Sequence, residues 1–335
     1  MVPPYSPPQQ AVEKNDLYIP LIDFSPFWSG TPSDKHSLAL SMIDALKASG
    51  FFYLKSHGIP PSEVSRVFDA SAHFFARPQT QKLELGWTTP QSNRGYVAVG
   101  REHLASQMDL KETMEIGREG VVEHPNHWPD HFDDEGKVFK ELMLSFFDRC
   151  KNLHVQILSA IALGMNLPTS FFDQFIDHGD NNLRLLHYPP VRKDLFHQSV
   201  PTDEHSDYGS ITLLFQDRHG GLQVRSPTGT FVDVIPIADS IVVNAGDLLA
   251  RWSNDTIRST HHRVIEPPKP VGEDPSTDAS DTYPSRHSIA YFCNPNRNAR
   301  IEALPGTFDE HVHRDKKYED VTAGEYLVQK LAATI

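Results

Sequence analysis

The stretch "EHSDYGSITLLFQD", residues 204–217, places two metal-binding residue types directly before an apolar run. His205 and Asp207 are two positions apart, and "SITLLFQ" follows them. On a β-strand, residues i and i+2 project from one face about 6.5–7 Å apart. An imidazole and a carboxylate in that arrangement can converge on one ion, so the stretch predicts two ligands of a metal site on a strand.

Short apolar runs, separated by turn signals such as "RHGG", "SPTGT" and "NAGD", fill the chain after residue 182. Closely spaced short strands of this kind are typical of a sandwich or a barrel, and a jelly roll is the natural candidate. In chain order, the expected strands are "LRLLHY", "SITLLFQ", "GLQVRS", "FVDVIP", "SIVVNA", "LLARWS", "HHRVIE" and "RHSIAYFC".

The first half of the chain has a mainly helical pattern. Apolar residues recur at three- and four-residue steps in 32–50, 62–78 and 138–163, which predicts three amphipathic helices. Ser33 is expected to cap the first of them. Between the first two, "FFYLKSHGIP" at 51–60 predicts a short strand.

These patterns predict one structural unit of class α+β. Residues 1–180 are expected to form a mainly helical region that packs on the core. Residues 181–335 are expected to form the jelly-roll core with a C-terminal helix. Within this core, "PPKPVGEDPSTDASDTYPS", residues 267–285, is polar and proline-rich, and it predicts a loop between two strands.

The composition bears on partners and compartment. The formal charge of −13 argues against a nucleic-acid or anionic-membrane partner, because either would need a basic face. No stretch approaches the roughly 18 consecutive apolar residues of a membrane span. The chain has only two cysteines, Cys150 and Cys293, which favours a reducing compartment. We therefore expect a cytoplasmic protein, and both a monomer and a weak dimer remain open.

The His-x-Asp pattern alone is weak evidence, because the sequence contains it four times and only the neighbouring residues distinguish the copies. Only the copy at 205–207 opens a strand-like run in the middle of the sheet region. The others stand in polar or charged surroundings, and we expect no metal there. The four copies are His131/Asp133, His178/Asp180, His205/Asp207 and His313/Asp315.

A third ligand must come from elsewhere, and "STHHRVIE" offers it. His261 and His262 are neighbours on an expected strand, so they face opposite ways and only one can join the site. Val264 shares a face with His262, which favours that face as the inward one. Two histidines and one carboxylate with open positions suit non-haem Fe(II) oxygenases, although a zinc enzyme could use the same set.

The order of motifs resembles that of Fe(II)/2-oxoglutarate-dependent dioxygenases related to isopenicillin N synthase. The resemblance covers about nine-tenths of the chain. It implies a double-stranded β-helix fold and a catalytic Fe(II) held by His205, Asp207 and His262. It also implies 2-oxoglutarate and O2 as cosubstrates, with succinate and CO2 released. The matching pieces are "IPLIDFS", "GFFYLKSHGIP", "NRGY", "DLKETMEIGRE", "LLHYPP", "EHSDYGSITLLFQDRHGGLQV", "VVNAGDLLARWSND", "STHHRV" and "RHSIAYF".

The cosubstrate's distal carboxylate needs a cation, and "RHSIAYF" supplies a suitable pair. Arg286 and Ser288 are two apart and point the same way on a strand. The planar guanidinium matches a carboxylate, and the serine adds a hydroxyl donor. The pair matches the family's Arg-x-Ser cosubstrate motif, and Tyr188 matches a family tyrosine that also reaches 2-oxoglutarate.

Further pieces resemble the thymine dioxygenases of this family, which oxidise the 5-methyl group of thymine. Phe292 and Tyr208 are expected to sandwich a flat base by offset stacking. Arg184 is expected to donate to a base carbonyl, with a buried structural ion pair as the alternative. These pieces are "ELGWTTP", "NRGY", "RLLHYP", "DYGSITLLFQD", "GDLLARWSNDTI", "YFCNPN" and "YLVQKLAAT".

Two other functions remain open at this point. One is the same chemistry on a fungal-type secondary metabolite, because the loop 267–285 is long and His287 replaces a more usual tyrosine. The other is a non-catalytic metal-binding jelly roll. Asn244 and Asp247 are assigned to turn chemistry. Lys111 and Glu112 are interpreted as a solvated pair, with a place at the pocket entrance as the alternative.

Overall fold

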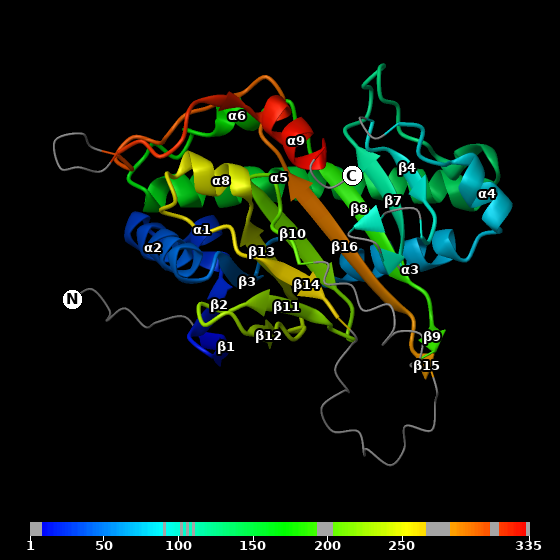
Figure 1. Cartoon of the computed structure of the whole chain (residues 1–335), viewed down its shortest axis with the longest axis horizontal. Helices are drawn as coiled ribbons and strands as arrows, with labels where there is room; N and C mark the ends of the chain where they lie inside the picture. The colour runs from blue at the N-terminus through cyan, green and yellow to red at the C-terminus, as the bar shows by residue number, and fades with distance from the viewer. Residues whose placement is uncertain are drawn as a thin grey trace, which may run out of the picture.

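The computed structural model describes residues 9–89, 92–100, 103–104, 107–108, 111–192, 204–265, 282–308 and 315–332. Two facing sheets form the β core, which confirms the α+β class and the jelly-roll, double-stranded β-helix architecture (Figure 1). In spatial order, the nine-stranded sheet contains β1 (Gln9–Lys14), β2 (Leu17–Asp23), β3 (Phe51–Lys55), β13 (Ser240–Ala245), β10 (Ile211–Gln216), β16 (Arg286–Cys293), β8 (Asn182–Tyr188), β7 (Glu112–Gly117) and β4 (Gly95–Val97).

The remaining strands of the described residues belong to smaller sheets. The second sheet of the core contains β12 (Phe231–Asp233), β11 (Leu222–Arg225) and β14 (His262–Val264). Three two-stranded pairs are β9 (Val191–Arg192) with β15 (Thr282–Tyr283), β17 (Arg300–Ile301) with β18 (Val321–Thr322), and β5 (His103–Leu104) with β6 (Gln107–Met108).

Helices cover the large sheet, and the long helix α5 runs behind it (Figure 1). The helices are α1 (Ser25–Ser29), α2 (Pro32–Ala48), α3 (Pro61–Phe75), α4 (Gln79–Glu84), the 3-10 turn η1 (Pro129–His131), α5 (Asp134–Gly164), α6 (Asp173–Ile176), α8 (Asp247–Trp252) and α9 (Ala323–Ala332). No helix in these described ranges is both long enough and apolar enough to cross a membrane.

Two hydrophobic clusters hold these layers together. The larger lies where α2, α3 and α5 pack on the nine-stranded sheet. The smaller lies between the two sheets, where Phe51 and Tyr53 of β3 meet Val224 of β11 and Val232 of β12. Because the core strands pack into these clusters, the strands that bear the candidate site residues are held firmly in place.

The N-terminal half contributes strands as well as helices. β1, β2, β3, β4 and β7 all belong to the nine-stranded sheet, so the sheet crosses residue 180. The β2–β3 pair is parallel, and β3 then pairs antiparallel with β13. The division at residue 180 stays a prediction. The two cysteines are free and buried.

Helix α2 forms where its pattern predicts it, but the expected cap is wrong. Thr31, not Ser33, is the N-cap residue. Its hydroxyl accepts a hydrogen bond from the Asp34 backbone N–H at 3.3 Å, and the Asp34 carboxylate accepts one from the Thr31 N–H at 2.9 Å. This reciprocal capping box satisfies two amide groups at once, which a serine inside the first turn cannot do.

Seven of the eight expected strands are present, and the eighth prediction, "LLARWS", is wrong. These residues belong to helix α8, which begins after Gly246 and buries Leu248, Leu249 and Trp252. A short apolar run fits a buried helix turn as well as a strand. Part of the expected loop 267–285 is a strand pair, since Thr282–Tyr283 pairs with Val191–Arg192, while residues 267–281 lie outside the described residues.

Candidate active site

His205, Asp207 and His262 come together where the two sheets meet. His205 and His262 exchange two backbone hydrogen bonds, of 3.0 and 2.9 Å. The Nε2 atoms of the two histidines lie 3.8 and 3.6 Å from Oδ1 of Asp207. Within the described ranges, these are the residues whose metal-binding atoms gather within 4.8 Å of one another. One ion can therefore contact all three.

His205 and Asp207 do not lie on a regular strand, which corrects the expected geometry. His205 forms an isolated bridge to His262, and β10 begins only at Ile211. The segment between them is held by α8, whose Asp247 and Leu248 backbone N–H groups donate to the carbonyls of Asp207 and Tyr208 at 2.7 and 3.2 Å. The Asp207 carboxylate is therefore positioned by the turn that precedes β10, and not by the alternation of side chains along the strand.

The carboxylate of Asp207 is oriented by two donors. Its Oδ2 accepts hydrogen bonds from Thr212 Oγ1 at 2.5 Å and Asn244 Nδ2 at 2.6 Å, which leaves Oδ1 toward the imidazoles. Burial works to raise the pKa of Asp207, but the two histidines and the two donors lower it overall. Asn244 is buried in β13, so assigning it to turn chemistry is wrong.

The tautomer of His262 is fixed by the backbone. Its Nδ1 lies 3.2 Å from the Thr260 carbonyl, an arrangement in which Nδ1–H donates and Nε2 keeps its lone pair. Burial lowers the pKa of His262, which favours the neutral imidazole that a metal requires. The neutral imidazole, the carboxylate and their outer hydrogen bonds fit a divalent transition metal.

The His131/Asp133 and His178/Asp180 pairs make structural contacts. His131 contacts Glu84 at 3.0 Å, and Asp133 caps α5 while pairing with Arg77 at 2.8 Å. Asp180 pairs with Arg118 at 3.3 Å. His313 lies outside the described residues. His261 faces away from the metal candidates, as expected, and contacts Glu204 at 2.9 Å.

Arg286 is a buried cation on β16. Its Nε donates to the Gly220 carbonyl at 2.6 Å, and its Nη1 donates to Ser288 Oγ at 3.3 Å. The Tyr188 ring lies 4.9 Å from the guanidinium carbon, and the two residues are directly opposite on β8 and β16. Across the described part of the chain, no carboxylate forms an ion pair with Arg286. A buried guanidinium in these surroundings suits an anionic ligand.

Arg184 and Phe292 lie side by side on β8 and β16. The guanidinium carbon is 5.5 Å from the centre of the Phe292 ring. Arg184 Nε also lies 2.5 Å from Oε1 of the buried Glu115. Tyr208 is half-buried, and its ring lies 5.9 Å from the amino group of Lys330. The base sandwich of Phe292 and Tyr208 stays a prediction.

The solvated pair expected at Lys111 and Glu112 is wrong, because both residues are buried. Glu112 accepts a hydrogen bond from Lys82 Nζ at 2.8 Å and lies 2.7 Å from His187 Nδ1. It also accepts one from the Tyr96 hydroxyl. Every residue of β7 is buried, so its polar side chains need partners from other elements.

His287 lies on the face of β16 opposite Arg286 and Ser288. Its ring stacks on that of His187 at 4.5 Å and 14°. Burial lowers the pKa of His287 to about 4, so the ring is neutral at neutral pH. The unusual histidine therefore belongs to the packing between β16, β8 and helix α3 rather than to the candidate site.

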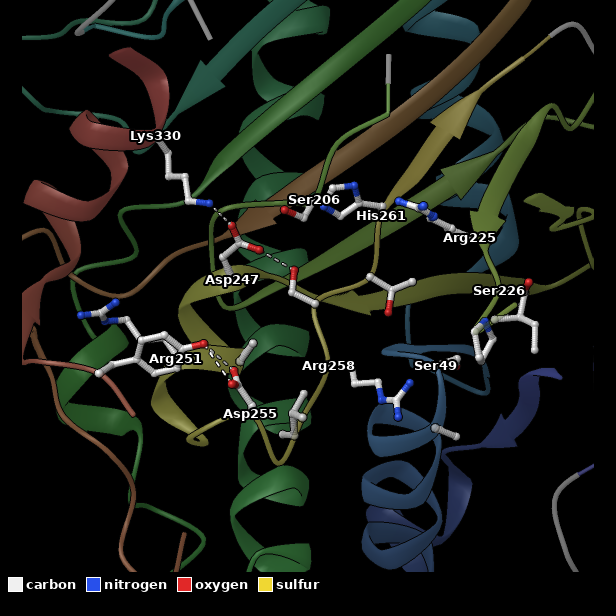
Figure 2. Close-up of a pocket in the computed structure, with 18 of the residues that line it drawn as sticks. Ser49, Ser206, Arg225, Ser226, Asp247, Arg251, Asp255, Arg258, His261 and Lys330 are labelled. Carbon is white, nitrogen blue, oxygen red and sulfur yellow. Dashed lines mark hydrogen bonds and ion pairs between the residues drawn. The ribbon is translucent and has the colours of Figure 1, made fainter. Parts of the chain in front are cut away.

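A hollow of about 660 Å³ lies beside the segments that supply the metal candidates, and none of His205, Asp207 and His262 lines it. Ser206 and His261 line it (Figure 2), and both are sequence neighbours of metal candidates. Asp247 of α8 and Lys330 of α9 form another part of its wall. The hollow is therefore separate from the metal and cosubstrate candidates.

Comparison with known proteins shows the family. Residues 179–295 match the 2OG-Fe(II) oxygenase superfamily, and residues 19–131 match the N-terminal domain described as non-haem dioxygenase in morphine synthesis. A 2-oxoglutarate-Fe(II) type oxidoreductase of Metarhizium rileyi is 34% identical over 93% of this chain and 90% of its own length. A proline hydroxylase of Petromyces alliaceus is 35% identical, over 93% and 98%.

A solved structure resembles the whole chain. The thymine hydroxylase of Neurospora crassa, in complex with alpha-KG and thymine, is 49% identical, covers 98% of this chain and 100% of its own, and superposes with a TM-score of 0.88. Its complex with alpha-KG and 5-formyluracil is 50% identical, covers 97% and 99%, and also has a TM-score of 0.88. The chain therefore belongs to the 2-oxoglutarate-Fe(II) oxygenase superfamily, as a dioxygenase that uses Fe(II), 2-oxoglutarate and O2.

Proposed function

We propose that this dioxygenase hydroxylates the methyl group of thymine. The observation that carries the proposal is the contact between the Arg184 guanidinium and the Phe292 ring, on the two strands that also bear the cosubstrate candidates. The pair offers a stacking face and a hydrogen-bond donor to one flat polar ring. About half of the aligned residues are identical in the Neurospora crassa thymine hydroxylase, which has been solved with thymine and with 5-formyluracil.

In this proposal His205, Asp207 and His262 hold Fe(II) on one side, and the rest of the ion is left to cosubstrates. Bound iron couples the decarboxylation of 2-oxoglutarate by O2 to substrate oxidation, which is chemistry that side chains lack. Thr212 and Asn244 keep Oδ1 of Asp207 directed at the metal. Their role is orientation, because outer hydrogen bonds tune the ligands they touch.

Arg286, Ser288 and Tyr188 bind the distal carboxylate of 2-oxoglutarate. The Arg286 side chain is already oriented by Gly220 and Ser288, so little side-chain entropy is lost when the anion arrives. A carboxylate beside this guanidinium gains a charge-assisted hydrogen bond in a water-poor place. The cosubstrate is thereby fixed at the end remote from the iron, which sets where its reactive end lies.

Phe292 and Tyr208 stack on the two faces of the base, and Arg184 donates to one of its carbonyls. Glu115 holds Arg184 through Nε, and a guanidinium has further N–H groups to offer a ligand. The ion pair and the base contact are therefore compatible. With the ring held this way, the methyl group would be the position that is oxidised by the chemistry of the bound iron.

The second candidate function is oxidation of a secondary metabolite. It is favoured by relatives of about one-third identity, which include the proline hydroxylase of Petromyces alliaceus and the oxidoreductase of Metarhizium rileyi. Hydroxylation, desaturation and ring expansion all belong to this candidate. A non-catalytic role is dropped, because the chain is a dioxygenase of this superfamily. A cytoplasmic location and a monomer or weak dimer stay predictions.

Succinate release tests the choice between the two functions. The Fe(II) protein is incubated with 2-oxoglutarate and O2, with and without thymine, and succinate is measured. Thymine-dependent succinate, with hydroxymethyl, formyl or carboxyl products identified by mass spectrometry, supports the proposal. The proposal is overturned in favour of the second candidate if succinate release rises with proline or with larger substrates but not with thymine.

A further inference from the structure

Asp247, the first residue of α8, contacts three separate parts of the chain. Its backbone N–H donates to the Asp207 carbonyl at 2.7 Å. Its Oδ1 accepts a hydrogen bond of 2.6 Å from Ser259 Oγ. Its Oδ2 lies 2.7 Å from Lys330 Nζ on α9, and Figure 2 shows that amino group reaching down to the carboxylate. One residue thus links the C-terminal helix to the metal-binding segment, through its carboxylate on one side and its backbone N–H on the other.

Ser259 extends this link to the third metal candidate. It precedes Thr260, whose carbonyl lies 3.2 Å from Nδ1 of His262 and fixes its tautomer. Asp247 therefore touches both segments that supply metal candidates, the one that ends in Asp207 and the one that leads into His262. The carboxylate of Asp247 contacts the segment that leads into His262, and its backbone N–H contacts the segment that holds Asp207.

Lys330 also reaches the proposed substrate side. Its amino group lies 5.9 Å from the centre of the Tyr208 ring and 5.5 Å from that of Tyr326. Both distances are within reach of a cation–π attraction. Burial acts against the charge, but the contact with Asp247 raises the pKa of Lys330 overall, so the side chain stays cationic at neutral pH.

We infer that Lys330 is a positioning residue, which couples docking of helix α9 to the placement of Tyr208 against the substrate. It holds the Tyr208 ring directly, and it holds the backbone of the Asp207–Tyr208 segment through Asp247. The inference rests on the proposed function, because it takes Tyr208 as a substrate contact. Leu248, next to Asp247, completes the link by donating its N–H to the Tyr208 carbonyl at 3.2 Å.

The C-terminal segment has anchors besides Lys330, which makes the inference testable. The Arg251 guanidinium lies 4.8 Å from the centre of the Tyr318 ring. The Tyr318 hydroxyl and Lys317 both bind Asp255, at 2.8 and 2.9 Å. Removing the charge of Lys330 should therefore leave the segment docked, with the Tyr326 hydroxyl still donating to Asp247 at 3.3 Å, while the contacts of Lys330 with Tyr208 and Asp247 are lost.

Three variants separate positioning from folding. Lys330→Met keeps the length of the side chain and removes its charge, and Lys330→Arg restores a charge. Lys316→Met is the matched control, because Lys316 lies in the same C-terminal segment and pairs with Asp320 at 2.6 Å, away from Asp247. Each full-length variant is loaded with Co(II) and 2-oxoglutarate without oxygen, and thymine affinity is measured by calorimetry.

We expect Lys330→Met to weaken thymine binding by about fivefold to tenfold, the size of one partly desolvated cation–π contact. Lys330→Arg should return to within about twofold of wild type, and Lys316→Met should bind like wild type. Unchanged thymine binding in Lys330→Met overturns the inference. Equal losses in Lys330→Met and Lys330→Arg also overturn it, because the charge then has no positioning role.

Hydrogen exchange without thymine gives a readout that does not depend on the substrate. The Asp247 and Leu248 amides donate to the carbonyls of Asp207 and Tyr208, and they should exchange faster in Lys330→Met than in Lys316→Met. If the wild type fails to bind thymine while this difference appears, the proposed substrate is wrong and the positioning link stands. If exchange is the same in both variants, the link itself is refuted.

Discussion

Thr212 and Asn244 lie directly opposite each other on β10 and β13, and both donate to the same oxygen, Oδ2 of Asp207. Two paired strands thus hold one carboxylate oxygen from both sides. Rotation of the carboxylate would break at least one of these bonds. The orientation of Asp207 is therefore built into the sheet.

Replacing Asn244 should weaken metal binding without removing a ligand. For Asn244→Ala we expect metal affinity to fall about 10- to 100-fold, the usual effect of losing a hydrogen bond behind a ligand. Calorimetric titration with Co(II) measures this loss. Ser240→Ala, at the start of the same strand, is the control and should titrate like wild type. Equal affinities for the Asn244 variant and wild type would show that Thr212 alone orients the carboxylate.

Asp207→Ala should abolish both metal binding and succinate release, because it removes the anionic ligand between two imidazoles. Asp180→Ala is the comparison, since it removes a carboxylate from another His-x-Asp pair that contacts Arg118. It should keep turnover. A dead Asp180 variant with an active Asp207 variant would mean that the metal site has been assigned to the wrong pair.

Arg286→Gln should raise the KM for 2-oxoglutarate about 10- to 100-fold, which corresponds to one charge-assisted hydrogen bond. Arg286→Lys should fall in between, because an ammonium keeps the charge but loses the planar fork. Steady-state kinetics with varied 2-oxoglutarate give the result. The control is Arg263→Gln, which removes a guanidinium that stacks on Phe231 at 3.8 Å in the other sheet. A normal KM in Arg286→Gln would place the cosubstrate elsewhere.

Phe292→Leu should raise the KM for thymine about 2- to 10-fold, the value of one offset stacking contact beyond area burial. The KM for 2-oxoglutarate serves as the internal control and should not change. Kinetics with each substrate varied in turn separate the two effects. A rise in both constants would indicate a disturbed strand β16 rather than a lost stacking partner.

His154 should make folding sensitive to acid. Burial in α5 lowers its pKa to about 3, whereas an unfolded histidine titrates near 6.5. Below pH 6.5 the unfolded chain therefore binds a proton that the folded chain refuses, and stability falls with pH down to about 3. At pH 5.5 this linkage lowers the free energy of unfolding by about 1 kcal/mol.

The variant His154→Gln removes this proton linkage. Urea unfolding at several pH values measures it, as the difference in the free energy of unfolding between wild type and variant. That difference should shift in favour of the variant as the pH falls from 7 to 5. A difference that does not change with pH would mean that His154 is protonated in the fold as readily as in the unfolded chain.

The metal ligands could be predicted from the sequence, because the evidence for them lies in neighbouring residues and in the alternation of faces along a strand. His205 and Asp207 precede an apolar run, and His262 shares a face with Val264. Their meeting, however, depends on the backbone bridge between His205 and His262 and on α8 behind the turn, which spacing does not encode. The role of Asn244 is also indicated in the sequence, because a polar residue inside the apolar run "SIVVNA" needs a buried hydrogen-bond partner.

Two of the failed predictions share a physical cause, which is that the deciding partner is distant in sequence. Glu112 looks like a solvated residue until Lys82 and His187 are placed beside it. "LLARWS" satisfies a buried strand as well as a helix turn, and the bonds that α8 makes to the distant Asp207 segment favour the helix. Patterns within a segment cannot supply such contacts.

The position of β16 in the large sheet has a consequence for biosynthesis. β16 is hydrogen-bonded to β10 on one side and to β8 on the other, although both are made long before it. Until residue 293 has left the ribosome, each of those earlier strands presents an open edge. Nascent chains of this protein are therefore exposed to edge-to-edge association late in translation, when chaperone protection counts most.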